Sequence, residues 1–172
     1  HCRTTVFDGI SLKKGEKYDF SLFARVAPGS KGGKVVVCLL DQTGREIARS
    51  SVNVSSKEWK KQQTVLTANA DGACRRCSRF SRRRWGTLHL DMISLFPQNT
   101  FKGHKNGLRA DLAQTLADLH PRFVRFPGGC VAHGDGIDNI YDWKGSIGPL
   151  EARKPLRNLW GVSSDTRTGL LR

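Results

Sequence analysis

The stretch Arg122-Phe-Val-Arg-Phe-Pro-Gly-Gly-Cys130 decides the fold, because a short apolar run ends there in an abrupt Pro-Gly-Gly turn. This pattern predicts a buried β-strand, and barrel enzymes place ligand-contacting residues at the ends of such strands. The preceding residues 106–119 predict a helix, which His120-Pro121 closes. Its apolar side chains recur at helical spacing, at Leu108, Leu112, Ala113, Leu116 and Leu119. A helix that leads into a short apolar strand is half of an α/β repeat.

The residues before this repeat alternate as half-buried strands do. Within residues 17–27, apolar side chains occupy every second position, at Tyr18, Phe20, Leu22 and Ala24. Further strands are expected at residues 35–40, 46–54, 59–66 and 87–95, with Gly-rich or polar turns between them. Short strands joined by such turns predict an antiparallel β-sandwich.

The pattern changes after Phe96-Pro97, where a polar linker leads into the amphipathic helix. We therefore expect one domain at residues 1–97 and a second at residues 98–172. A complete (β/α)8 barrel needs about 250 residues, so any barrel in 172 residues is partial. The chain begins with His1 and shows neither a signal-peptide pattern nor a membrane-spanning run, so we expect it to come from within a longer parent.

With Trp143-Lys-Gly-Ser-Ile-Gly-Pro149 and Asn158-Leu-Trp-Gly161, the stretch 122–130 resembles the family 51 glycoside hydrolases, the α-L-arabinofuranosidases. The resemblance runs from about Phe7 to Gly161, with one discordant segment. It implies a β-sandwich insert, similar to a carbohydrate-binding module, after which a (β/α)8 TIM barrel resumes. The expected fold is therefore the end of that sandwich followed by the start of a truncated barrel.

The resemblance also implies a catalytic mechanism. Retaining glycosidases use two carboxyl groups about 5 Å apart, a nucleophile and an acid/base. In this family the acid/base is the Glu of an Asn-Glu pair, and the nucleophile is a Glu on a later strand. The chain has no Asn-Glu pair; its glutamates are Glu16, Glu46, Glu58 and Glu151. We expect no catalytic residue in this chain and no hydrolysis by the isolated fragment.

Cys130, Gly129 and Trp143 are predicted to contact substrate. Cys130, directly after the two glycines, is implied by the resemblance to line the subsite for the arabinofuranosyl ring; the alternative is a buried thiol that helps to close the turn. At Gly128 and Gly129 a Cβ would obstruct the turn or the sugar. Trp143 would support the rim of the active site, with structural packing as the alternative.

No cofactor and no metal are expected. His133, Asp135 and Asp138 share a polar loop, but hard-metal loops supply more oxygen ligands at regular spacing, and the resemblance implies no catalytic metal. Cys74-Arg-Arg-Cys77 lacks the second pair that a zinc site needs. Cys38, in an apolar run, is expected to pack as a small apolar residue.

The net charge of +14 is concentrated in one segment. Without the six arginines between residues 75 and 84 the formal charge would be +8. The segment Gly72–Trp85 lacks the period of two expected of a sandwich strand, and we interpret it either as a frame error or as a real basic loop. Residues 1–6 and 166–172 likewise depart from the pattern of the family. If the arginines are genuine, nucleic-acid binding through them is a third possible function, with strong salt dependence.

For the parent, the favoured function is removal of terminal non-reducing α-L-arabinofuranosyl residues from arabinose-containing polysaccharides or oligosaccharides. The alternative is a non-catalytic carbohydrate-binding or structural module. Sugar-binding modules use exposed aromatic rings, for which Tyr18 and Trp59 are the large candidates, although core packing is favoured for both. Neither nucleic acid nor membrane is the expected partner. The intact parent is expected outside the cytoplasm, periplasmic or secreted, where it could form a homo-oligomer.

Overall fold

The computed structural model describes residues 4–77, 86–125, 128–157 and 163–164. The chain divides into two compact units, His1–Ala110 and Asp111–Arg172.

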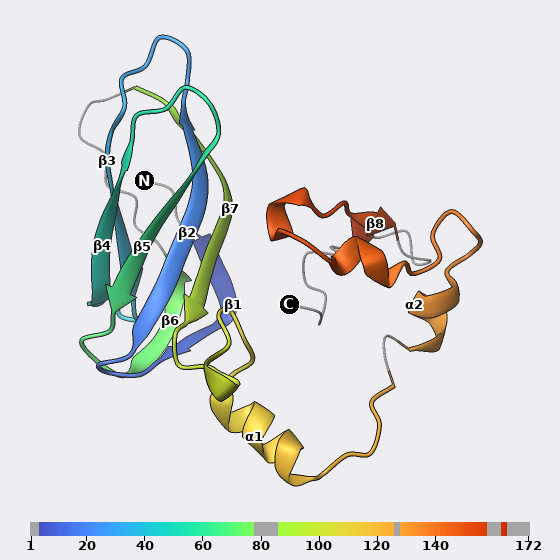
Figure 1. Cartoon of the computed structure of the whole chain (residues 1–172). Coiled ribbons are helices and arrows are strands. Elements are labelled where there is room, and N and C mark those ends of the chain that lie inside the picture. The colour runs from blue at the N-terminus through green and yellow to red at the C-terminus, as the bar shows by residue number, and fades with distance from the viewer. Residues whose placement is uncertain (1–3, 78–85, 126–127, 158–162, 165–172) are drawn as a thin grey trace. The chain divides into compact units, whose positions relative to one another are not determined.

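The first unit consists of two antiparallel sheets whose strands run along a common long axis (Figure 1). The four-stranded sheet has the order β1-β6-β3-β4, and the three-stranded sheet has the order β5-β2-β7. The strand bounds are β1 Thr4–Leu12, β2 Lys17–Val26, β3 Gly33–Leu40, β4 Glu46–Val54, β5 Lys60–Thr67, β6 Gly72–Cys77 and β7 Leu88–Pro97.

Strand β2 shows why the two sheets pack together. Its even-numbered residues from Tyr18 to Val26 are buried and its odd-numbered outward residues are only partly covered, because successive side chains of a strand point to opposite faces. Leu22 and Ala24 are completely buried. They join one apolar cluster with side chains from both sheets, including Val37 of β3 and Ile47 of β4. Burial of this shared core makes the unit a β-sandwich.

The five strands expected from the sequence are confirmed as β2, β3, β4, β5 and β7. Two further strands, β1 and β6, were not anticipated. They pair with each other, with Leu12 opposite Gly72 and Ile10 opposite Cys74. The prediction that the basic segment carries no strand was therefore wrong for residues 72–77, because backbone pairing with β1 does not require alternating side chains. Residues 78–85, with the rest of the arginine run, lie outside the described part, as do residues 1–3 and 165–172.

Strand β7 is followed by the single-turn helix η1 (Phe101–Gly103) and an isolated bridge between Thr100 and Arg109. Helix α1 (Ala110–Asp118) begins after this bridge and is followed by His120, which has a positive φ of 49°. The helix is thus shorter than the expected span 106–119. The remaining elements are α2 (Gly129–His133), η2 (Trp143–Ser146), η3 (Leu150–Ala152), β8 (Leu156–Arg157) and β9 (Ser163–Ser164).

The strand expected at residues 122–130 is not formed. Residues 122–125 have no strand structure, with Phe123 and Val124 84% and 79% exposed, and residues 129–133 are helical. Residues 126–127 are outside the described part. A parallel barrel strand is held by hydrogen bonds to neighbouring strands and buried by helices. Among the described residues nothing pairs with this segment, and its apolar side chains stay exposed.

Candidate functional site

The turn that carries Cys130 is built by glycines at both ends of α2. Gly128 precedes the helix with a φ of 109°, and Gly134 ends it with a φ of 60° and donates its N–H to the Cys130 carbonyl at 3.2 Å. Side chains rarely adopt such positive φ values, so both positions favour glycine. Cys130 itself is exposed, in contrast to the buried thiol of the alternative interpretation.

Gly129 is less constrained than its neighbour. A Cβ added there would meet only the Nη2 of Arg125, at 3.9 Å, which is an ordinary van der Waals contact. The prediction that a Cβ at Gly129 would obstruct the turn is therefore wrong, and the conformational requirement falls on Gly128.

Asn139 organises the loop after α2. Its Oδ1 accepts hydrogen bonds from the backbone N–H groups of Asp135 at 2.7 Å and Gly136 at 3.2 Å. The Tyr141 N–H then donates to the Ala132 carbonyl at 3.2 Å, which ties the segment before Trp143 back to α2. Sequence reasoning missed Asn139, although an Asp and an Asn four residues apart in a Gly-containing loop is a signal for such side-chain-to-backbone bonds.

Trp143 starts the short helix η2 and is 52% exposed. The Asp142 carboxylate caps this helix by accepting from the Lys144 N–H at 3.0 Å. The buried Ser146 hydroxyl donates to the Trp143 carbonyl at 2.6 Å. The backbone under Trp143 is therefore fixed while its ring remains accessible.

The loop residues considered for a metal are engaged within their own turns. His133 Nδ1 bonds the Gly134 carbonyl at 2.6 Å, and the Asp135 carboxylate accepts from Asn139 at 3.4 Å. Across the described ranges, no cluster of three or more His, Cys, Asp or Glu side chains is arranged to hold a metal ion. Within these same ranges, no helix is both long and apolar enough to cross a membrane.

Two glutamates of the sandwich have structural partners. Glu46 accepts two hydrogen bonds from Arg49, at 2.9 and 2.8 Å, and these bonds lower the pKa of its carboxyl group. Glu16 accepts from the Tyr18 hydroxyl at 3.3 Å and from Asn99 at 2.9 Å. These contacts account for both carboxylates as parts of the sandwich.

The structure separates the two aromatic candidates for sugar stacking. Tyr18 is 3% exposed, and burial raises the pKa of its hydroxyl, which accepts from the Lys13 N–H at 2.9 Å. Core packing is thus confirmed for Tyr18. Trp59 is 45% exposed, so the favoured packing interpretation was wrong for this residue.

Buried thiols account for two other cysteines. Cys38 is 3% exposed, and burial raises the pKa of its thiol, as expected of a small residue packed in a sheet. Cys74 is fully buried in the core cluster, so the first thiol of the Cys-x-x-Cys pair serves packing.

Comparison with known proteins connects this geometry to one group of enzymes. A family model described as the "Alpha-L-arabinofuranosidase 1 domain" matches residues 115–172. An extracellular exo-α-L-arabinofuranosidase of Streptomyces chartreusis is 34% identical over 172 residues, covering 94% of this chain and 20% of the relative. The α-L-arabinofuranosidase 1 of Arabidopsis thaliana is 35% identical over 150 residues, covering 84% of this chain and 21% of the relative.

A solved structure matches nearly the whole chain. An arabinose-bound family 51 α-L-arabinofuranosidase superposes with a TM-score of 0.85 at 31% identity, covering 98% of this chain and 28% of that one. The chain spans about a fifth of the length of the curated relatives it matches. The resemblance inferred from the sequence is thereby confirmed.

Proposed function

We propose that this chain, which matches the family 51 α-L-arabinofuranosidases in sequence and in structure, is part of a longer enzyme of that activity. The parent would remove terminal non-reducing α-L-arabinofuranosyl residues from arabinose-containing polysaccharides or oligosaccharides. The observation that carries the proposal is the TM-score of 0.85 over 98% of the chain against an arabinose-bound enzyme of this family.

The parent would act by a retaining double displacement. One carboxylate attacks the anomeric carbon while a carboxylic acid protonates the leaving oxygen, and a covalent glycosyl-enzyme forms. The group that gave up its proton then acts as a base and activates a water molecule. This water attacks the glycosyl-enzyme, which releases arabinose and frees the nucleophile. The Asn-Glu pair required for this chemistry is absent from the chain, so both groups would come from other parts of the parent.

Hydrolysis of an aryl α-L-arabinofuranoside tests whether the catalytic pair lies in the parent but outside this chain. The intact parent should release the phenol, and the purified 172-residue chain should not. Activity in the isolated chain would contradict the claim that it lacks the catalytic pair. An inactive intact parent with an Asn-Glu pair and a later Glu in place would contradict the assigned function.

Within the parent, residues 98–172 would begin the resumed (β/α)8 barrel and residues 1–97 would complete the sandwich insert. Burial of α1 against other helices and strands would explain its exposed leucines, because an amphipathic helix is stable when its apolar face is covered. Cys130 and Gly129 would line the arabinofuranosyl subsite and Trp143 its rim. The exposure of Cys130 and Trp143 supports these roles.

Substitution in the intact parent tests these contacts. Cys130→Ser keeps the size of the side chain and should raise KM, whereas Trp143→Ala should weaken binding of polysaccharide more than that of the aryl glycoside. Unchanged kinetics in both variants would remove the residues from the site.

The location of the parent follows the same resemblance. The Streptomyces relative is named extracellular, and we propose that the intact parent is periplasmic or secreted, where it could assemble as a homo-oligomer. Fractionation of the source cells, with size-exclusion chromatography of the intact parent, tests both statements.

The second candidate function is that the sandwich is a non-catalytic carbohydrate-binding or structural module. The observation that favours carbohydrate binding is the exposure of Trp59. This residue directly precedes β5, in the sheet whose opposite face forms the core. If the isolated chain binds an arabinose-containing polysaccharide without hydrolysing it, the binding role is distinguished from catalysis.

A further inference from the structure

The outer face of the three-stranded sheet combines aromatic rings with cations. In the register of β2 and β7, Arg25 lies opposite His89 and Phe23 lies opposite Asp91. Trp59 directly precedes β5, whose second residue Lys61 lies opposite Phe23. These side chains therefore form adjacent rows across three strands. We call the face formed by Phe23, Arg25, Trp59, Lys61 and His89 the Trp59 face.

Arg25 is the centre of this face. Its guanidinium carbon lies 5.0 Å from the centre of the Trp59 ring, a cation–π contact. Its Nε donates to His89 Nδ1 at 3.1 Å. The Trp59 and His89 rings are themselves 6.4 Å apart. The side chain of Arg25 is thus held in place from both sides.

This arrangement pre-orients the fork of terminal N–H groups on the Arg25 guanidinium, which can bind an anion. The bond to His89 uses Nε and leaves the terminal guanidinium nitrogens outside that contact. A planar guanidinium binds carboxylates through such paired N–H groups, and prior ordering lowers the entropic cost of binding. Next to the fork, the exposed part of the Trp59 ring provides an apolar surface on which the C–H groups of a sugar ring can stack.

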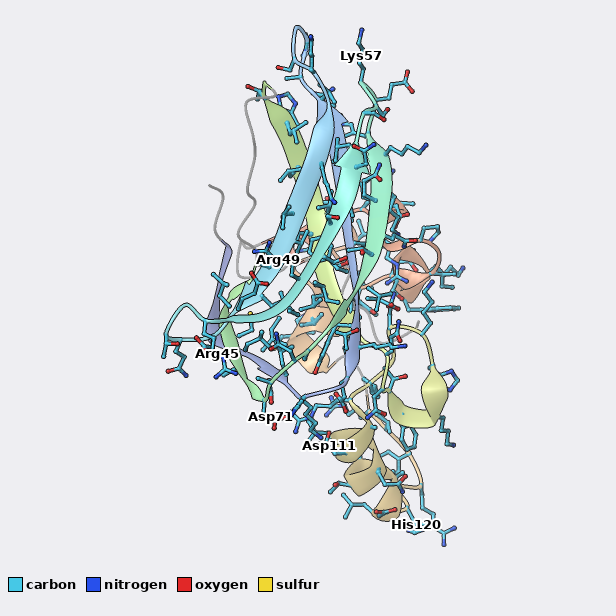
Figure 2. The ribbon with its side chains drawn as sticks, turned by 90° about the vertical axis from the view of Figure 1, so that its left-hand side faces the viewer. Arg45, Arg49, Lys57, Asp71, Asp111 and His120 are labelled. Atoms are coloured by element: carbon cyan, nitrogen blue, oxygen red, sulfur yellow. The ribbon has the colours of Figure 1, made fainter. Side chains whose placement is uncertain are left out.

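The face carries a second cation beside Arg25. Lys61 is exposed and lies opposite Phe23, and its ammonium lies 5.7 Å from the Phe23 ring. Lys57, in the turn before β5, projects from one end of the sandwich, opposite the end that carries Asp71 (Figure 2). Arg25 and Lys61 thus place two cations in adjacent rows of the face, where a carboxylate can pair with them.

We infer that the Trp59 face binds uronic-acid units of an acidic polysaccharide, with the sugar carboxylate on Arg25 and the sugar ring against Trp59. Asp91 and Asp19, on the same side of the sheet, can accept hydrogen bonds from the ring hydroxyls of a sugar, which a DNA strand does not offer. A glycan therefore fits better than a nucleic acid. The inference concerns binding alone and does not depend on the hydrolytic activity proposed for the parent.

Titration of the full 172-residue chain with polygalacturonate, neutral arabinan and a single-stranded DNA oligonucleotide tests the inference. The unmodified chain should bind polygalacturonate more tightly than the other two. Arg25→Gln and Trp59→Ala should each weaken this binding about tenfold or more, because a charge-assisted bidentate contact or a stacking surface is lost. Arg25→Lys, which keeps the charge without the fork, should fall between.

Arg49→Gln is the matched control, since it removes the same charge from an exposed arginine of the other sheet. It should leave polygalacturonate affinity within about twofold. Circular dichroism of every variant checks folding, and Trp59→Phe, which retains an aromatic ring, should keep most of the affinity. Equal losses in Arg25→Gln and Arg49→Gln would mean that only general positive charge binds, and would overturn the inference. Tighter binding of DNA, or failure to bind polygalacturonate, would overturn it as well.

Discussion

The two units of the chain differ in the burial of their apolar side chains. In the first unit, the two sheets bury a continuous cluster that includes Leu22, Val37 and Ile47. In the second unit, Leu116 and Phe123 are 60% and 84% exposed although their sequence patterns are as apolar as those of the strands. The contrast teaches that a pattern specifies which face is apolar, whereas burial requires a partner that covers this face.

The largest expected effect is the loss of a core side chain. Leu22→Ala should lower the free energy of unfolding by about 3 kcal/mol, because it removes a fully buried side chain and leaves a cavity. Leu116→Ala in the second unit should change it by less than about 0.5 kcal/mol, since this side chain is exposed. Urea unfolding followed by circular dichroism measures both. Equal losses would mean that α1 is packed in solution.

Thiol labelling gives the next largest contrast. Cys130 is exposed, whereas Cys38 and Cys74 are buried in the sandwich. A pulse of iodoacetamide should alkylate Cys130 about a hundredfold or more faster than the other two, because they react only when the sandwich opens. That ratio corresponds to about 2.7 kcal/mol of opening free energy. Peptide mass spectrometry quantifies each site, and in strong denaturant the three rates should converge.

Glycine substitutions sharpen the comparison at the level of the backbone. A Cβ at Gly32 would press against the carbonyl oxygen of Val54 and lie 2.8 Å from the Ser55 Cα, so backbone would have to move. Gly32→Ala should therefore cost about 2 kcal/mol of stability. Gly129→Ala, whose Cβ would meet only a distant arginine atom, should cost less than about 0.5 kcal/mol. Thermal or urea unfolding would contradict this if Gly129→Ala were the more damaging change.

The smallest effect comes from the exposed ion pair between Glu46 and Arg49. The hydrogen bonds from Arg49 lower the folded-state pKa of Glu46, so the pair stabilises the fold above the unfolded pKa of about 4.3 and loses this contribution as the pH falls through the folded value. Both side chains are substantially exposed, so solvent screening keeps the contribution small. Glu46→Gln should lower the urea midpoint slightly at pH 7 and leave it unchanged at pH 3. An equal loss at both pH values would point to packing instead.

The sandwich could be predicted where the sequence pattern and its partner lie in the same unit. Strand β4 agrees with the expected span 46–54 residue for residue, and its Ile47, Val52 and Val54 are buried in the core that both sheets share. Strand β6 was missed because Gly72-Ala-Cys-Arg-Arg-Cys77 has no alternation. Its strand structure follows from pairing with β1, about 60 residues earlier, which no local pattern encodes.

The candidate site could be predicted only in part. The sequence located the special turn at the glycines, and the structure assigns the backbone requirement to Gly128 rather than Gly129. The strand expected before Cys130 failed because residues 122–125 depend on neighbours that the described residues do not supply. The organising role of Asn139 was missed because side-chain bonds to backbone depend on loop geometry rather than on periodicity.

The alternation of β2 has a consequence for how this sandwich can diverge among related proteins. Its inward residues are committed to the core, whereas Asp19, Ser21, Phe23 and Arg25 share the opposite side of the same ten-residue strand. Substitutions in the outward set can accumulate without repacking the interior, and each one re-specifies the surface that the central strand displays. A single scaffold can thus acquire new ligand preferences in successive lineages while its fold is inherited unchanged.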